Sequence, residues 1–215
     1  IKAGQTLALV GATGSGKSSI INLLSRNYNH DKGEVLIDGV NYLDFELSSL
    51  RSQMSLVLQD VFLFSDTVLN NIALNQEISI EQVRSSAQKI GVNSFIENLP
   101  EEYQYNVKER GAMLSVGQRQ LLSFLRAYVS NPSILILDEA TSNIDSETEQ
   151  LIQHAIVELT QGRTSIVIAH RLATIQNADK ILLLEDGQIL ESGTHQELIQ
   201  KGGQYKTLFD LQFQE

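Results

Sequence analysis

The chain has 215 residues, of which 42% are hydrophobic, carries a formal net charge of −10 and contains no cysteine. Its length and apolar content are sufficient for a large buried core, so a disordered chain is excluded. The negative charge argues against a nucleic-acid partner, and the lack of cysteine excludes disulfides, thiolate catalysis and cysteine-bound zinc. The longest apolar runs are strand-sized and far shorter than the roughly 20 residues that span a bilayer.

The first predicted element is a strand over residues 6–10, followed by a glycine-rich turn and a helix that starts near Lys17. Glycines let the turn bend around a polyphosphate and direct its N–H groups inward, where the positive end of the helix adds to the field. Lys17 then reaches the β- and γ-phosphates, and the hydroxyl of Ser18 is placed to bind Mg²⁺. A similar turn can occur without a ligand, but glycine-lysine-serine at this offset favours a nucleotide-binding loop. Its residues are Gly11, Ala12, Thr13, Gly14, Ser15, Gly16, Lys17, Ser18 and Ser19.

The next elements predict an α/β fold. Residues 33–39 alternate between apolar and polar side chains and end in Asp-Gly, which predicts an antiparallel strand and turn. A short buried strand is expected over residues 55–58. From residue 68 to about 128 the pattern is helical, most clearly over residues 80–90 and 116–129.

Apolar strands return after this helical block, over residues 134–137, 165–168, 180–184 and 188–190, with a helix over residues 147–160. Strands that alternate with helices indicate a mostly parallel sheet. We therefore expect a mostly parallel core, an antiparallel β subdomain and an inserted α-helical subdomain over about residues 68–128.

Two carboxylates, Asp138 and Glu139, follow the apolar strand at residues 134–137. Ligands of open α/β sheets bind beyond the carboxyl ends of the strands. Asp138 is placed to hold Mg²⁺ through water, and Glu139 to orient and polarise the water that attacks the γ-phosphate. The alternative is that the pair caps the next helix, but Ser142 and Asp145 are better placed for capping.

The segment Leu-Ser-Val-Gly-Gln at residues 114–118 leads into the helix expected over residues 116–129. Several motifs occur in the order and spacing of ATP-binding-cassette (ABC) transporter ATPases: the phosphate loop, Gln59, the segment at 114–118, Asp138-Glu139, the turn at 142–145 and His170. The chain resembles this family over essentially its whole length. The resemblance implies a core of the P-loop NTPase type, ATP and Mg²⁺ as ligands, and ATP hydrolysis.

The resemblance also implies roles for single residues. Gln59 contacts Mg²⁺ and the attacking water and senses the transmembrane partner, and His170 resembles the switch histidine that contacts the γ-phosphate. Ser115, Gly117 and Gln118 belong to the signature that binds ATP held by a second ATPase domain, with Ser115 and Gly117 donating from the helix N-terminus. Metal binding falls to Ser18, Gln59 and Asp138, catalysis to Lys17, Glu139 and His170, and Asp145 joins the nucleotide-binding set.

Within the family the chain resembles exporters. The segment Glu109-Arg110-Gly111 is typical of exporters, and importer ATPases generally lack it. The implied partners are a transmembrane domain, contacted through the Gln59 and Glu109-Arg110 regions, and a second ATPase domain, identical or a different subunit. The implied location is the cytoplasmic face of the cell membrane. The chain looks cut from something longer, because the segment that stacks on adenine normally lies further upstream of the phosphate loop.

The signature departs from the family pattern at Val116, where glycine is usual, and Asn143-Ile144 replaces the usual Ala-Leu. A β-branched side chain limits the approach of the backbone to a phosphate and disfavours a positive φ. An altered signature beside intact Lys17, Asp138 and Glu139 resembles one subunit of the heterodimeric multidrug exporters. A homodimer with the same substitution is the alternative.

Other classes fit the sequence less well. A small GTPase would carry Asn-Lys-x-Asp, which is absent, and a small-molecule kinase has no need of the signature segment or His170. DNA-repair and chromosome-associated cassette ATPases share the signature, but they insert long coiled coils or DNA-binding domains, and this chain has neither sustained heptads nor a basic stripe. The sequence therefore predicts the ATP-hydrolysing motor domain of an exporter, with the non-transport cassette ATPase and the importer ATPase as alternatives.

Overall fold

A computed structural model describes the chain over residues 1–74, 76–138, 144–169 and 171–213. The chain divides into two compact units, each made of segments that are not consecutive in the sequence. The first unit comprises Ile1–Ser55, Pro132–Glu139 and Gly162–Glu215, and the second comprises Leu56–Asn131 and Ala140–Gln161. Within the described ranges, no helix has the length and apolar character needed to cross a membrane.

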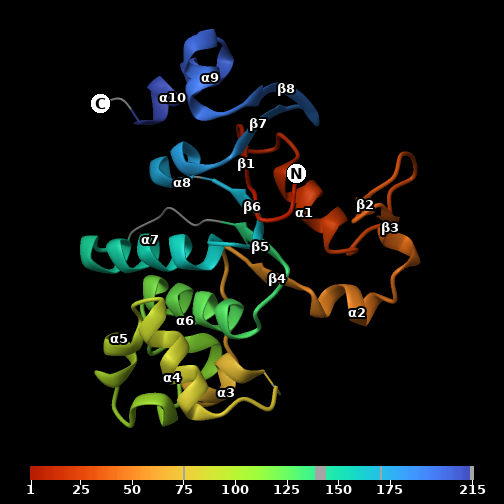
Figure 1. Cartoon of the computed structure of the whole chain (residues 1–215). Coiled ribbons are helices and arrows are strands. Elements are labelled where there is room, and N and C mark those ends of the chain that lie inside the picture. Colours follow the sequence, from red (N-terminus) through yellow and green to blue (C-terminus); the bar gives the residue numbers. More distant parts are fainter. Residues whose placement is uncertain (75, 139–143, 170, 214–215) are drawn as a thin grey trace. The chain divides into compact units, whose positions relative to one another are not determined.

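The described residues form a six-stranded sheet in the order β4-β5-β6-β1-β7-β8 (Figure 1). β1 runs parallel to β6 and β7, β5 runs parallel to β6, and β8 pairs antiparallel with β7. The inner strands are apolar runs with mostly buried side chains, as expected for parallel strands covered on both faces. The predicted mostly parallel sheet is confirmed. The strands are β1 (Thr6–Val10), β4 (Met54–Val57), β5 (Ile134–Asp138), β6 (Thr164–Ile168), β7 (Lys180–Glu185) and β8 (Gln188–Gly193).

A small antiparallel sheet of β2 (Leu36–Ile37) and β3 (Val40–Asn41) lies in the first unit. Its turn residues Asp38 and Gly39 have φ of 51° and 80°, the left-handed conformation of tight hairpins. The antiparallel element is thus confirmed, although its first strand is shorter than predicted. The helices of this unit are α1 (Lys17–Leu24), η1 (Tyr42–Asp44), α2 (Leu47–Ser52), α8 (Leu172–Asn177), α9 (His195–Lys201) and α10 (Gln204–Phe213).

The second unit is built mainly from helices. α6 carries a buried stripe that includes Leu121 and Leu125, and it packs against α3 and α7 (Figure 1). α4 and α6 each begin with a capping box, in which a serine and the glutamine three residues on satisfy each other's backbone N–H groups. The elements are α3 (Val68–Ala73), α4 (Ile80–Lys89), α5 (Asn93–Glu97), η2 (Glu102–Gln104), η3 (Glu109–Gly111), α6 (Val116–Val129) and α7 (Ser146–Thr160).

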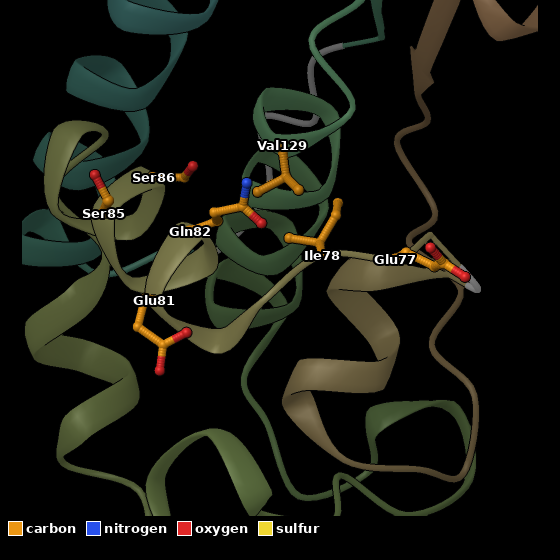
Figure 2. Close-up of a pocket in the computed structure, with 7 residues that line it drawn as sticks. All are labelled: Glu77, Ile78, Glu81, Gln82, Ser85, Ser86 and Val129. Atoms are coloured by element: carbon orange, nitrogen blue, oxygen red, sulfur yellow. The ribbon is translucent and has the colours of Figure 1, made fainter.

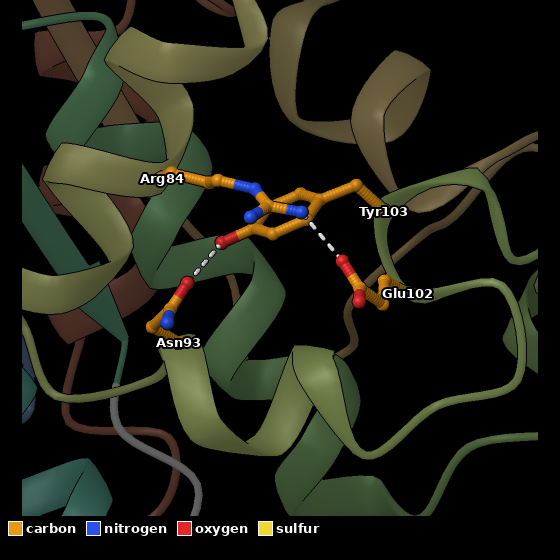
Figure 3. A network of polar contacts seen from close by, with 4 residues as sticks. All are labelled: Arg84, Asn93, Glu102 and Tyr103. Carbon is orange, nitrogen blue, oxygen red and sulfur yellow. Dashed lines mark hydrogen bonds and ion pairs between the residues drawn. The ribbon is translucent and has the colours of Figure 1, made fainter.

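A buried tyrosine joins three of these helical elements (Figure 3). The hydroxyl of Tyr103 in η2 donates to Oδ1 of Asn93 in α5 at 2.7 Å. The guanidinium of Arg84 in α4 lies 5.3 Å from the centroid of the tyrosine ring and pairs with Glu102. Burial raises the pKa of Tyr103 to about 12, so the phenol keeps its proton, and this hydrogen bond, to a higher pH than an exposed tyrosine would. The network fixes short helices that have little stability of their own.

Candidate nucleotide-binding site

The phosphate loop predicted from the sequence connects β1 to α1. Gly11 directly follows β1, and its backbone lies close to β7. A Cβ at this position would lie under 3.0 Å from the carbonyl oxygen of Leu184. Gly16, just before α1, has φ of 104°, which side chains rarely allow. The fold therefore requires glycine at both positions, by space at Gly11 and by backbone conformation at Gly16.

Lys17 points its ammonium into this loop. Nζ donates to the carbonyl oxygens of Gly11 and Ala12 at 2.7 and 2.8 Å, and to Oγ of Ser15 at 3.3 Å. The side chain is 9% exposed, and burial lowers its pKa while the nearby Asp138 carboxylate opposes this shift. The loop thus holds a cation at its centre, surrounded by oxygen atoms.

The turn between β7 and β8 braces the loop. The N–H of Gly187 donates to the carbonyl oxygen of Ser15 at 3.1 Å, and the Cα of Gly187 would lie 3.5 Å from a Cβ on Gly16. Sequence reasoning missed this contact. The Asp186-Gly187 pair between two strands is typical of a tight turn, but nothing in the pattern indicates which loop the turn contacts.

The strand register brings Asp138 to the same edge of the sheet as the loop. Asp138 at the end of β5 pairs with Ile168 at the end of β6, and Ile168 pairs with Leu9 near the end of β1. The N–H of Ala169 also donates to the carbonyl oxygen of Leu9 at 3.2 Å. The carboxyl ends of β5, β6 and β1 therefore meet at one edge, where Asp138 and Lys17 interact electrostatically. Glu139, Ser142, Asn143 and His170 lie outside the described residues.

The second unit contains the other predicted site residues. Gln59 is exposed just after β4. Ser115 is the exposed N-cap of α6, and its Oγ accepts from the N–H of Gln118 at 3.2 Å while Oε1 of Gln118 accepts from the N–H of Ser115 at 3.0 Å. Gly117 is buried in the first turn. The N-terminus of α6 is therefore preformed and accessible at Ser115.

Val116 begins α6 with its side chain 46% exposed, and its φ is not positive. The expectation that a β-branched residue would disturb a positive φ here is wrong, because this position is the first residue of a right-handed helix. The substitution of Val116 for the usual glycine therefore adds bulk at the surface without backbone strain.

Asp145 caps α7. Its Oδ1 accepts from the N–H of Thr148 at 2.9 Å, and hydrogen bonds from the backbone and then the side chain of Thr148 hold the pKa of this carboxyl below its usual range. The carboxylate is exposed at the helix N-terminus, where a negative charge is favourable.

The segment after Gln59 is held in place by the buried side-chain amide of Asn71. Asn71 in α3 is 1% exposed, and its Oδ1 accepts from the N–H of Phe64 at 2.8 Å. Its Nδ2 donates to the carbonyl oxygens of Phe64 and Thr67, each at 3.0 Å. Arg126, whose pKa burial lowers, donates to the carbonyl oxygen of Asn71 at 2.9 Å. One side chain therefore sets the path of the chain around Phe64.

Replacing Asn71 with alanine is expected to lower the free energy of unfolding by about 2 to 4 kcal/mol. The substitution leaves the N–H of Phe64 without its acceptor, which costs roughly 1–3 kcal/mol. It also removes one of the two hydrogen bonds to each of the carbonyl oxygens of Phe64 and Thr67, and each lost bond costs roughly 0.5–1.5 kcal/mol. Urea unfolding followed by circular dichroism measures the change. Asn70→Ala, at the neighbouring exposed position, is the matched control. An Asn71→Ala protein that unfolds within ~0.5 kcal/mol of this control would contradict the assigned role.

The two regions expected to face a transmembrane partner are joined in this unit. Leu63 is fully buried, and its Cδ1 would lie 2.8 Å from a Cβ on Gly111, the last residue of η3. On either side, Phe62 and Phe64 are 55% and 53% exposed, and their rings meet edge to face at 5.1 Å. The Glu109-Arg110-Gly111 segment and the segment after Gln59 are therefore neighbours, with two aromatic rings exposed beside them.

A pocket of about 470 Å³ opens elsewhere in the helical unit, where Gln82 of α4 and Val129 of α6 line it (Figure 2). Glu77 and Glu81 give its rim negative charge, which disfavours a phosphate ligand. The pocket contains none of the residues predicted from the sequence to bind nucleotide.

Comparison with known proteins decides the family. The family model described as ABC transporter matches residues 1–142. The chain belongs to the ABC transporter family. A bacterial Atm1-family ABC exporter with ATP bound has the same fold, with a TM-score of 0.92 and 40% identity over 100% of this chain and 38% of its own.

Curated relatives of this ABC transporter domain are close in sequence. A putative ABC transporter ATP-binding protein, exp8, of Streptococcus pneumoniae is 53% identical over 99% of the chain and 36% of its own length. A probable multidrug resistance ABC transporter ATP-binding/permease protein, YheH, of Bacillus subtilis is 50% identical over 97% of the chain and 31% of its own length. The chain thus spans about a third of these relatives. It is an ATPase domain of the ABC transporter family that is similar to those of exporters, and the non-transport alternative is not favoured.

Proposed function

We propose that this domain binds MgATP between itself and a second ATPase domain and that hydrolysis drives export of a substrate across a membrane. The observation that carries the proposal is the position of Lys17, which lies at the centre of the phosphate loop with the Asp138 carboxylate nearby. This pairing supplies a cation for the β- and γ-phosphates and a carboxylate for their metal ion.

The residues at this edge suit Mg²⁺. Ser18 lies exposed in the first turn of α1, next to Lys17, and Asp138 interacts electrostatically with the same lysine. Hydroxyl and carboxylate oxygens are the hard ligands that Mg²⁺ prefers. When bound, the ion would neutralise charge on the β- and γ-phosphates. Substrate phosphates and water are expected to complete the coordination, because Mg²⁺ in such sites is bound through few side chains and keeps several waters.

The chain's own residues then carry the hydrolytic step. Lys17 donates to the phosphates and offsets their charge as it shifts towards the leaving group. Glu139, directly after β5, accepts a proton from the attacking water and orients it, and His170, directly after Ala169, donates to the γ-phosphate. Both follow strands whose ends meet at one edge of the sheet, which supports their approach to a common ligand.

A second ATPase domain supplies the other half of each site. Ser115 and the first N–H groups of α6 are suited to an anion, because a helix N-terminus carries unpaired donors and positive potential. They face the nucleotide of the partner in this proposal. The partner is either an identical chain or a different subunit. Because Val116 causes no backbone strain, the signature segment of this chain is compatible with either partner.

A transmembrane partner would dock beside Gln59. The exposed rings of Phe62 and Phe64, next to η3, form an aromatic patch held in place by Asn71 and Arg126. Such a patch suits a partner helix, since exposed aromatic side chains in contact are enriched at protein interfaces. In this proposal the domain lies at the cytoplasmic face of the membrane.

ATP turnover by the native transporter in lipid nanodiscs tests the proposal. We expect Mg²⁺-dependent hydrolysis that stops when the metal is chelated. Serine at both Phe62 and Phe64 should change turnover at least ~3-fold while ATP binding stays constant, because the partner contact is weakened by roughly 1–2 kcal/mol. Leu74→Ser, at another exposed apolar residue of the same unit, is the control. Hydrolysis that persists without Mg²⁺, or a phenylalanine double variant that behaves like the control, would refute the corresponding part.

A further inference from the structure

The first turns of α6 and α7 meet at Gly117. A Cβ on this glycine would lie under 3.0 Å from Cγ2 of Thr148, and 3.2 Å from Cγ2 of Ile144. Gly117 has ordinary helical backbone geometry, so its conformation does not require glycine. Glycine is required at this position for lack of space, because the methyl group of Thr148 lies where a Cβ would be.

Hydrogen bonds from the N–H and the hydroxyl of Thr148 fix the direction of this methyl group. The N–H of Thr148 donates to Oδ1 of Asp145 at 2.9 Å, and the hydroxyl of Thr148 bonds to the same carboxylate. A threonine whose hydroxyl is held in this way has its methyl group held as well, because both are attached to one Cβ. The methyl group is thereby kept against Gly117.

We propose that Thr148 is a positioning residue for the N-terminus of α6, because its methyl group, seated on Gly117, sets the distance between the first turns of α6 and α7. Ser115 caps the same turn, so the position of its hydroxyl follows from this contact. The inference rests on the proposed function, in which Ser115 contacts the ATP of a second domain. It assigns the glycine at 117 to packing inside this domain, in addition to any approach to phosphate.

A rescue experiment in the native transporter tests the inference. Gly117→Ala is expected to lower ATP turnover at least ~10-fold, since overpacking of this size displaces a helix end. ATP affinity of the phosphate loop in the other unit should stay within ~2-fold. Adding Thr148→Ser should restore turnover to within ~3-fold of Thr148→Ser alone, because serine keeps the hydroxyl for Asp145 and lacks only the methyl group. Ile144 then needs to move only a few tenths of an ångström.

Thr148→Val is the matched control, because valine keeps a methyl group at the contact and loses the hydroxyl. Gly117→Ala combined with Thr148→Val should therefore stay as inactive as Gly117→Ala alone. Failure of Thr148→Ser to rescue, or equal rescue by Thr148→Val, would overturn the positioning role.

Thermal unfolding of the same proteins without nucleotide separates this inference from the proposed function. Gly117→Ala should lower the melting temperature when Thr148 is present and leave it nearly unchanged when Thr148→Ser is also present. This result is expected even if the wild-type transporter does not hydrolyse ATP, which would refute the proposed function alone. An equal fall in melting temperature in both backgrounds would refute the contact itself.

Discussion

Glu139→Gln is expected to reduce ATP turnover by at least ~10²-fold while ATP binding is retained. Glutamine has nearly the same shape but cannot accept a proton from the attacking water. The residue directly follows Asp138, the end of β5, at the edge where the phosphate loop also lies. Because ATP binds and is not cleaved, the two ATPase domains should remain associated. Phosphate release from the native transporter and size-exclusion chromatography with ATP measure the two effects.

Glu147→Gln is the control, since it neutralises an exposed carboxylate in the first turn of α7. It should leave turnover within ~2-fold of the wild type. Near-normal turnover in Glu139→Gln would remove Glu139 from the role of general base.

Lys17→Met is expected to weaken ATP binding by about 10- to 100-fold. Methionine fills a similar volume but removes the ammonium that bonds to the loop carbonyls and would meet the phosphates. Hydrogen bonds of a charged group contribute roughly 1.5–3 kcal/mol, which corresponds to this loss of affinity. Titration calorimetry with MgATP at constant salt measures the dissociation constant.

The matched control is Lys32→Met, which removes an exposed lysine in the same unit. It should change the dissociation constant less than ~2-fold, because exposed charges contribute little across solvent. If Lys17→Met binds MgATP within ~3-fold of the wild type, then the backbone N–H groups of the loop carry the affinity and the assigned role of the lysine is wrong.

The sequence predicts most elements because their signals are local. The run of glycines before Lys17 requires a loop and a helix start, and the apolar spacing over α6 predicts that helix to the residue. The strand that ends in Asp138 is equally clear, since an uncharged run bounded by polar residues is the pattern of a buried strand.

Contacts between distant residues could not be predicted. The brace from Gly187 to Ser15, and the packing of Leu63 on Gly111, join segments whose separation in the chain carries no pattern. Gly117 shows the same limit. From the sequence, the glycine at this position is explained by ligand binding, because it belongs to the signature segment. Its contact with Thr148 depends on how α6 and α7 cross, which the sequence does not indicate.

During synthesis, β1 is made long before the two strands with which it pairs. Its residue Thr6 pairs with Ser165 of β6, and Leu7 pairs with Lys180 of β7, so both partner strands are translated long after β1 has been made. Until then an apolar strand has two open edges, the condition under which chains pair with the wrong partner. The helices between these strands have closer contacts in sequence and form sooner. We therefore expect β1 to be protected from wrong pairing either by rapid synthesis of the rest of the chain or by a chaperone that binds the unpaired strand.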